Sequence, residues 1–339
     1  MRHALELIAT ARRGVEFGGQ EFPTVWNVQR DAGNPVIDVN DNPNESTEQY
    51  RPAPIKLPNG DIWVYVKGTS VIYAWRSTDG GVTFALQNSN NAVISPGGGG
   101  AWDNSFTVEP VAVYDEQTDV IHLWYGGRGS GGDSTWGWGH ATAPGSTPTV
   151  LTKDAANPIL TSATVSADLG GQSMADLKIS DVVVIGNDFH FFGYALYDSV
   201  YRIIRAIGST WNDPADVEIL LSAAGGAHTV VQGVSAFRVP GQFTPRYGML
   251  YTTGGSQPSN PRWIRSGYSE DGLSWTFLTS DIISPTSGWE ATQVYVGSVL
   301  KESASPYLMP SRDPTGRWLY YYSGYASPDA SVGLAYLSP

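Results

Sequence analysis

The chain has 339 residues, with 32 Asp or Glu against 20 Lys or Arg and a formal net charge of −12. It contains no Cys, so neither a disulfide scaffold nor a thiolate-ligated metal or iron–sulfur site can form. The acidic balance and the scattered Arg residues disfavour a nucleic-acid partner, which needs a gathered basic surface. No apolar run reaches the roughly 18–20 residues that cross a bilayer, which argues against a membrane protein.

The N-terminal segment is a poor secretory signal. Residues 1–13 read MRHALELIATARR, in which Glu6 interrupts a short apolar stretch and two arginines follow it. We expect residues 1–20 to form an arm and residues 21–339 to form a single domain. The location stays open between the cytoplasm, a virus particle, and secretion with the signal removed.

From residue 51 onward the same unit recurs along the chain. Each unit opens with a hairpin of β-branched and aromatic residues around a turn of Gly, Pro, Asn or Asp. These hairpins are predicted at 51–66, 109–127, 181–194, 233–251 and 305–324. After each of the first four come a third strand and a short edge segment, the latter at 92–94, 157–160, 218–220 and 281–283. Four strands in each of five units predict an all-β fold, a five-bladed β-propeller of four-stranded antiparallel blades.

The two ends of the chain complement each other. The fifth unit ends at 332–337 without a fourth strand, whereas residues 24–27, leading into 34–37, have no hairpin of their own. An N-terminal strand added to the last blade would pair its open edge and close the ring. The turn at 77–84, STDGGVTF, fits the Asp-box that braces hairpins at the periphery of propeller blades. This turn supports the fold and says nothing about function.

Candidate functional residues lie at or before the predicted starts of the innermost strands, around the central channel. Carboxylates, a few cations and tryptophans suit a sugar, because aromatic faces stack on pyranose CH groups and carboxylates hold hydroxyls. The candidate catalytic residues are Glu48, Glu109, Asp176 and Asp181. The candidate substrate-binding residues are Arg51, Trp102, Asp103, His228, Gln232, Trp289 and Glu290. Simpler explanations stand beside these: Glu109 as a solvated strand end, Asp181 as a partner of Lys178, and His228 as an ordinary hydrogen-bonded residue.

Three short motifs, together with the count of five units, resemble a known group of enzymes. They are the Glu109-Pro110 step, the turn at 269–275 and the edge segment at 157–160. They look like the five-bladed glycosidases of glycoside hydrolase family 43 and the related families 32, 62, 117 and 130. In family 43 a base, a pKa-modulating carboxylate and an acid come from the first three blades. By position, the resemblance implies Glu109 in blade two and Asp181 or Asp176 in blade three.

Blade one departs from the pattern of family 43. The family's Asp-Pro is Arg51-Pro52 here, which leaves Glu48 as the nearest carboxylate. An Arg at this point could instead bind an acidic sugar or a phosphate. His228 resembles the blade-four histidine that lines the centre in family 43, sometimes near a bound calcium. A structural calcium ion in the central channel is the one metal that the resemblance allows, and no cofactor is expected.

Two functions follow from these observations. The first is a glycoside hydrolase acting on a polysaccharide or oligosaccharide through carboxylate acid/base catalysis, with two carboxyl groups about 6.5–9.5 Å apart if it is inverting. The second is a non-catalytic glycan-binding or structural propeller, such as a component of a virus particle or surface appendage. The missing blade-one Asp favours the second. In both, the expected partner is a glycan rather than a nucleic acid or a membrane, and assembly into a larger particle or oligomer is open.

Overall fold

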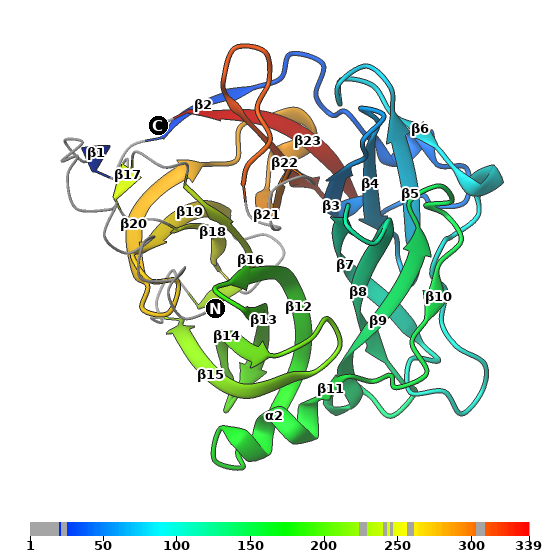
Figure 1. Cartoon of the computed structure of the whole chain (residues 1–339), viewed down its shortest axis with the longest axis vertical. Coiled ribbons are helices and arrows are strands. Elements are labelled where there is room, and N and C mark those ends of the chain that lie inside the picture. Colours follow the sequence, from blue (N-terminus) through cyan, green and yellow to red (C-terminus); the bar gives the residue numbers. More distant parts are fainter. Residues whose placement is uncertain are drawn as a thin grey trace, which may run out of the picture.

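The structure is a computed structural model that describes residues 26–223, 229–239, 247–255, 261–302 and 309–338, and the backbone of 20–21 and 243–244. Five antiparallel blades are arranged around a common centre (Figure 1), and a single parallel pairing of Arg262 with Gln293 joins blades four and five into one eight-stranded sheet. Each innermost strand contacts the innermost strand of the next sheet, and the last contacts the first. The predicted all-β, five-bladed propeller is confirmed. In the described part of the chain no helix is long and apolar enough to cross a membrane.

Each blade runs from the centre outward in chain order. The inner strands are β3 (Tyr50–Lys56), β7 (Phe106–Asp115), β12 (Met174–Ile185), β16 (Val230–Arg238) and β21 (Gln293–Val299). The second strands are β4 (Ile62–Lys67), β8 (Val120–Arg128), β13 (Asp188–Tyr197), β18 (Tyr247–Gly254) and β22 (Trp318–Ala326). The third strands are β5 (Ile72–Ser77), β9 (Trp136–Pro144), β14 (Val200–Gly208), β19 (Arg262–Ser269) and β23 (Asp329–Ser338).

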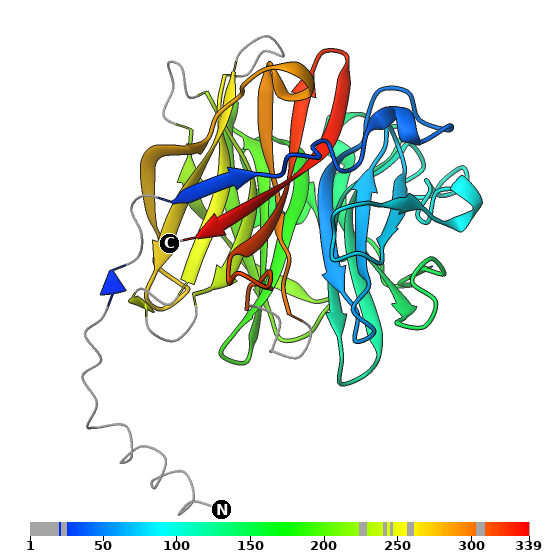
Figure 2. The same ribbon diagram turned by 90° about the horizontal axis from the view of Figure 1, so that it is seen from above.

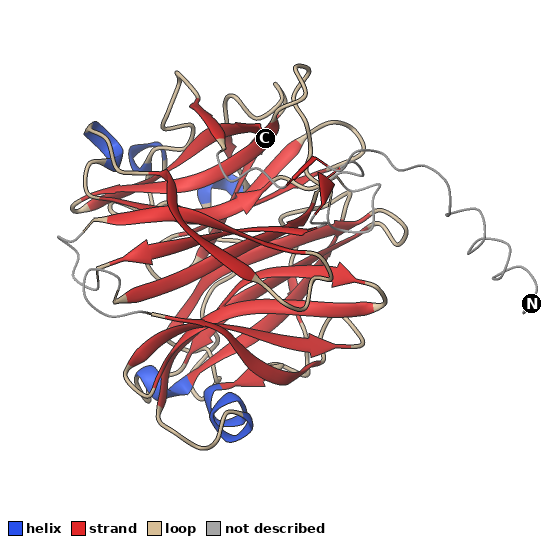
Figure 3. Ribbon diagram, turned by 90° about the vertical axis from the view of Figure 1, so that its left-hand side faces the viewer, coloured by secondary structure: helices blue, strands red, loops and turns tan. Residues whose placement is uncertain are grey.

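The outer strands vary in length, and that of blade five comes from the N-terminal part of the chain. They are β6 (Ala85–Leu86), β10 (Thr152–Lys153) with β11 (Leu160–Thr161), β15 (Pro214–Ser222), β20 (Thr276–Ile283) and β2 (Asn27–Arg30). A separate parallel pair joins β1 (Gln20–Glu21) to β17 (Phe243–Thr244). The helical segments are α2 (Ser162–Asp168) and the 3-10 turns η1 (Val39–Asp41), η2 (Asn88–Asn90), η3 (Asp133–Thr135) and η4 (Gly288–Glu290). They lie at the ends and edges of the strands (Figure 3).

The N-terminal strand completes the last blade. β2 pairs antiparallel with β23, with Asn27 opposite Ser338, and the two strands lie side by side in Figure 2. Further along, Ile37 forms a bridge with Val332. The chain therefore takes the fourth strand of blade five from its N-terminal end, as the sequence predicted.

The inner strand of blade five is not the predicted one. The sequence predicts this strand at 305–309, of which residues 305–308 lie outside the described part of the chain. The strand that pairs with β22 is β21, with Tyr295 opposite Ser323 and a register shift before Ser298. A bulge interrupts the alternation of side chains in a strand, so the pattern of β21 is weak in the sequence.

Polar turns at the periphery match their predicted type. In the first Asp-box turn, Asp79 accepts hydrogen bonds from the backbone of Val82 and Thr83, and Ser77 accepts one from Gly81. The turn at 269–275 repeats this with Ser269 and Asp271. These local bonds fix the hairpin ends without using any group at the centre of the ring.

Candidate functional site

Every inner strand has a β-bulge where it passes the axis of the propeller. Register shifts interrupt β3, β7, β12, β16 and β21 at about the same level. The bulged residues line the narrow central channel; they are Arg51, Pro52, Glu109, Pro110, Ser180, Gly233, Val296 and Gly297. Bulges re-aim side chains, and Arg51 and Glu109 adopt left-handed φ values of 57° and 54°. The Glu109-Pro110 step is therefore a bulge inside β7, not the start of a strand as predicted.

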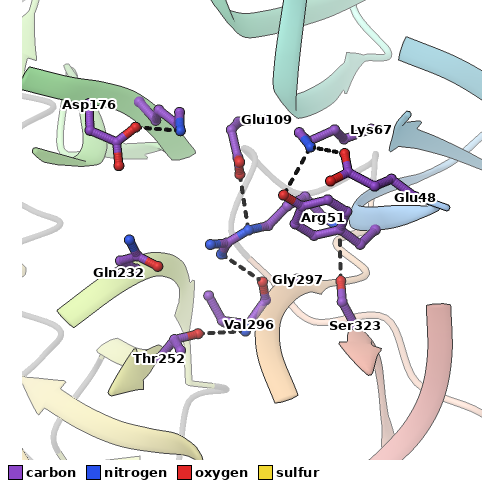
Figure 4. Close-up of polar contacts among 12 residues, drawn as sticks. Glu48, Arg51, Lys67, Glu109, Asp176, Gln232, Thr252, Val296, Gly297 and Ser323 are labelled. Carbon is purple, nitrogen blue, oxygen red and sulfur yellow. Dashed lines mark hydrogen bonds and ion pairs between the residues drawn. The ribbon is translucent and has the colours of Figure 1, made fainter. Parts of the chain in front are cut away.

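The Arg51 side chain crosses the axis and touches the other four blades. Its Nε lies 3.0 Å from Glu109 Oε2 in blade two, and its Nη1 donates to the Val296 carbonyl in blade five at 3.4 Å. The guanidinium carbon lies 5.6 Å from the ring centre of Tyr194 in blade three. In blade four, a Cβ at Gly233 would lie 2.5 Å from Nη1, so only glycine leaves room for the guanidinium. Figure 4 shows Arg51 between Glu109 and Val296.

The axial pair of Arg51 and Glu109 is buried. Their side chains are 7% and 5% exposed. Burial alone would lower the pKa of Arg51, but the Glu109 carboxylate raises it above its usual value. A buried carboxylate requires such a partner, because removing one ion leaves the other uncompensated. The position that the resemblance assigned to a catalytic base is thus occupied by a cation that engages the neighbouring acid.

An open pocket of about 660 Å³ lies above this pair, at the entrance to the channel, and we call it the mouth pocket. It is lined by Glu48, Tyr50, Lys67, Thr69, Phe106, Val108, Arg128, Asp133, Trp136, Asp176 and Lys178. Each carboxylate in it has a cationic partner: Lys67 Nζ lies 2.5 Å from Glu48, Lys178 Nζ lies 2.5 Å from Asp176, and Arg128 pairs with Asp133. The mouth pocket therefore presents alternating acceptors and donors.

The pKa values of the two lysines of the mouth pocket shift in opposite directions. Burial lowers the pKa of Lys67, although Glu48 and Glu109 act to raise it. For Lys178 burial also acts to lower the pKa, but Asp176 and Glu109 outweigh it and the pKa is raised. Lys67 also donates to the Tyr50 hydroxyl at 2.9 Å. These contacts hold the polar groups of the entrance in fixed positions.

The aromatic rings of the mouth pocket lie beneath its cations. The Arg128 guanidinium carbon is 4.3 Å from the ring centre of Phe106, and Lys178 Nζ is 4.5 Å from that of Trp136. Such cation–π contacts hold the charged groups over the rings. Glu48 and Asp176 keep side-chain exposures of 30% and 21%, so both remain accessible to a ligand.

Asp181 lies further along β12 and joins three blades. β12 begins at Met174 rather than at Asp181, so this carboxylate is inside the strand. It accepts from the Ala236 backbone N–H at 2.7 Å and from Lys301 Nζ at 2.6 Å, not from Lys178. Burial raises the pKa of Asp181, against the lowering effect of Lys301. It does not line the mouth pocket.

Trp102 and Asp103 pack onto the second strand of blade two. The Trp102 ring covers Gly127, where a Cβ would clash with it. Asp103 is buried and accepts from the Tyr125 hydroxyl at 3.2 Å and from Lys153 of the outer segment at 2.5 Å. We call this arrangement a Trp–acid brace, because it connects the outer segment of the blade to its second strand.

Trp289 and Glu290 form the same brace in blade five. Trp289 covers Gly324, and buried Glu290 accepts from the Tyr322 hydroxyl at 2.8 Å. Its other oxygen lies 2.7 Å from Arg30 Nε of the N-terminal strand β2. Asp103 and Glu290 thus lie among the blade's own strands and do not line the mouth pocket.

Of the two candidate residues in blade four, the structure describes Gln232 and not His228. Gln232 precedes the Gly233 bulge and accepts from Arg262 Nη1 at 2.8 Å; Figure 4 places it beside the axis. His228 lies outside the described residues.

Within the described ranges, no three His, Asp or Glu side chains gather to hold a metal ion. At the axis, a calcium ion would meet the Arg51 guanidinium, so these residues do not fit it.

Lys67 and Arg128 were missing from the predicted site. Both end second strands, where Lys67 lies opposite Tyr50 and Arg128 opposite Phe106. Counting residues outward from each predicted hairpin turn would have placed them at the entrance, because antiparallel partners are equidistant from the turn apart from bulges.

No protein-family model matches the chain, and no curated protein matches its sequence. Its fold matches solved structures. The α-L-arabinofuranosidase of Podospora anserina in complex with cellotriose aligns with a TM-score of 0.68 at 14% identity, over 94% of this chain and 99% of that one. The catalytic domain of a family 62 α-L-arabinofuranosidase from Coprinopsis cinerea gives 0.68 and 14%, over 94% and 98%.

A family 130 structure also matches. This family of mannoside phosphorylases contains glycoside hydrolases that target β-1,2-mannosidic linkages in Candida mannan. The structure aligns with a TM-score of 0.64 at 14% identity, over 93% of this chain and 96% of that one. At such identities the similarity concerns the fold. The resemblance inferred from the sequence motifs is confirmed at that level: the chain has the fold of the five-bladed propeller glycosidases.

Proposed function

We propose that the protein binds a carbohydrate in the mouth pocket and does not cleave it by the family 43 arrangement of three carboxylates. One observation carries the proposal: Arg51 stands where that arrangement places its first carboxylate, and it forms a buried ion pair with Glu109. A general acid or base must reach the bond that it cleaves. Glu109 is buried and engaged with Arg51, so it cannot serve that role without a large rearrangement.

The chemistry of the mouth pocket supports a sugar as the ligand. A sugar hydroxyl both donates and accepts, so it can bridge a carboxylate and an ammonium group, such as Asp176 and Lys178. Among the solved structures of similar fold, two are complexes with cellotriose and xylotriose, which adds support.

A second candidate function is a hydrolase that uses Glu48 and Asp176. Its support is that both carboxylates line the same open pocket and come from different blades. Each is bound to a lysine, however, and that ammonium group would have to move before the carboxyl could protonate a leaving group or activate water.

The test is a panel of oligosaccharides and polysaccharides, with binding measured by calorimetry and products by mass spectrometry. We expect binding without release of sugar, and we expect Asp176→Asn to weaken binding about tenfold, which is 1.4 kcal/mol. Glu116→Gln is the matched control, because Glu116 is exposed in the turn between β7 and β8, away from the mouth pocket.

Each other outcome has a meaning. Release of sugar that disappears in Glu48→Gln or Asp176→Asn would establish the hydrolase instead. Binding that Asp176→Asn leaves unchanged would place the ligand outside the mouth pocket, and no binding across the panel would overturn the proposal.

A further inference from the structure

A second pocket of about 850 Å³ lies on the other side of the loop from Arg128 to Trp136, and we call it the side pocket. It is lined by Gly100, Ala101, Trp102, Asn104, Gly129, Ser130, Ser134, Thr135, Trp136, Gly137, Pro158, Thr161, Ser162 and Ala163. Trp136 lines both pockets, while Arg128 and Asp133 of the same loop line the mouth pocket. The two pockets are therefore neighbours that share one wall.

The lining of the side pocket carries no charged residue, although the chain has a net charge of −12. It combines hydroxyl and amide groups with the apolar surfaces of Trp102, Trp136 and Pro158. A charged ligand would find no ionic partner among these residues. A neutral sugar fits, because its hydroxyls need small polar partners and its CH faces pack on aromatic rings.

The walls of the side pocket are held by contacts of their own. Trp102 is fixed by the Trp–acid brace of blade two, since Asp103 is bonded to Tyr125 and Lys153. On the opposite side, the Ser162 hydroxyl donates to the Trp136 carbonyl at 2.8 Å and ties the start of α2 to β9. The Thr161 hydroxyl oxygen caps α2 by accepting from the Thr164 backbone N–H at 3.1 Å. The pocket is preformed, which lowers the ordering cost of binding.

We propose that the side pocket is a carbohydrate subsite that holds further neutral sugar units of the chain whose first units occupy the mouth pocket. This inference rests on the proposed function and specifies its ligand: an oligosaccharide or polysaccharide with neutral units over blade two. The shared Trp136 gives the contact between the two subsites. Each further unit then adds binding energy in a region where the protein offers no ionic contact.

The experiment compares neutral oligosaccharides of increasing length, of the cello-, xylo- and manno- series, by calorimetry. We expect the affinity of the natural sequence to rise at least tenfold from the shortest to the longest binding member. Ala163→Trp places a large side chain in the side pocket from the exposed first turn of α2 and should abolish this gain. Its affinity for the shortest binding member should stay unchanged.

Two further variants make the experiment specific. Ala167→Trp is the matched control, because Ala167 is exposed on the same helix but does not line the pocket. Thr135→Trp blocks the pocket from the opposite, exposed loop and guards against a folding defect in Ala163→Trp, with circular dichroism as the check of folding.

The results separate the two proposals. An affinity that does not change with length, or a length-dependent gain that survives both blocking variants, overturns the side pocket alone. Short ligands that bind equally well to Asp176→Asn overturn the mouth pocket as the binding site, and a complete absence of binding overturns both proposals.

Discussion

In blade two, Trp102 covers the sheet and Asp103 binds Lys153 of the outermost segment; in blade five, Trp289 covers the sheet and Glu290 binds Arg30 of the outermost strand. In both, the acid also accepts a hydrogen bond from a tyrosine of the second strand. The two braces are alike although the outer segment of blade two follows its third strand along the chain, whereas that of blade five comes from the N-terminal part of the chain. The repeated unit therefore preserves the contacts that hold a blade together.

The same two blades differ at the axis and at the outer end of their strands. The bulge of blade two carries Glu109, while the register places Val296 at the corresponding position of blade five. Further out, blade two has His122 and His140 where blade five has Leu319 and Leu334. Blades two and five thus share the brace, whereas their bulge residues differ, because side chains from five blades meet in one narrow channel.

The largest effect is expected at the axis. Arg51→Met leaves Glu109 buried without its ion-pair partner, so the free energy of unfolding should fall by about 3–5 kcal/mol. Urea denaturation measures this loss. The double variant Arg51→Met with Glu109→Gln removes both charges and should recover most of it. A loss below about 1 kcal/mol in the single variant would show that the guanidinium is not needed to compensate the carboxylate.

The braces should respond equally in the two blades. Asp103→Asn and Glu290→Gln each weaken charge-assisted hydrogen bonds of a buried carboxylate, and each should cost about 1.5–3 kcal/mol of unfolding free energy. Glu116→Gln, at an exposed turn, should stay within about 0.5 kcal/mol of the unchanged protein. A loss in one brace without a loss in the other would break the equivalence of the blades.

The histidine pair of blade two introduces a pH dependence that blade five lacks at these positions. His122 Nδ1 lies 3.1 Å from His140 Nε2, and His140 Nδ1 lies 3.4 Å from Asp154. Burial, with a further contribution from His140, lowers the pKa of His122 from 6.5 to about 4; burial also lowers the pKa of His140. The unfolded chain then binds more protons than the folded protein below pH 6.5. The contribution of these histidines to the free energy of unfolding is fully present above that pH, and it is lost as the pH falls toward 4.

Replacing the pair with the leucines of blade five tests this directly. The free energy of unfolding, measured at several pH values, should decrease by about 1.4 kcal/mol for each unit by which the pH falls, for each extra proton that the unfolded chain binds. The double variant His122→Leu with His140→Leu should flatten the curve in this window. A residual slope should remain from His190, whose pKa burial lowers to about 4. An unchanged slope in the double variant would assign the pH dependence elsewhere.

The sequence predicted the repeat well because hairpins leave a local signal, and the pairing of β2 with β23 followed from a missing strand at one end and a spare one at the other. It missed β21, where a bulge hides the alternation of side chains. A proline inside a strand indicates such a bulge, so Arg51-Pro52 and Glu109-Pro110 carried a usable signal.

The candidate site was only partly predictable. Glu48 and Asp176 line the mouth pocket. Both precede the inner strands that the sequence predicts, although Asp176 lies inside β12 in the structure. Trp102 and Trp289 occur beside acids in similar loops, and no sequence pattern distinguishes Trp102, which lines the side pocket, from Trp289, which packs on Gly324. Asp181 meets Lys301 across 120 residues of chain, and such a distant partner leaves no local trace.

The smallest effect is expected where hydroxyl groups join neighbouring blades. Ser323 of blade five accepts the backbone N–H of Arg51 at 2.8 Å, and Thr252 of blade four accepts that of Val296 at 2.8 Å. Both hydroxyl residues are fully buried. Ser323→Ala and Thr252→Val should each cost about 1 kcal/mol of unfolding free energy, since each removes one hydrogen bond. If the bulges differ only in the side chains they present, the two losses of unfolding free energy should match. Ser323→Ala alone should also weaken glycan binding, because it releases the backbone that orients Arg51 and adjoins Tyr50. A large loss of unfolding free energy in Ser323→Ala with an unchanged glycan affinity would instead show that Arg51 stabilises the fold and does not influence the mouth pocket.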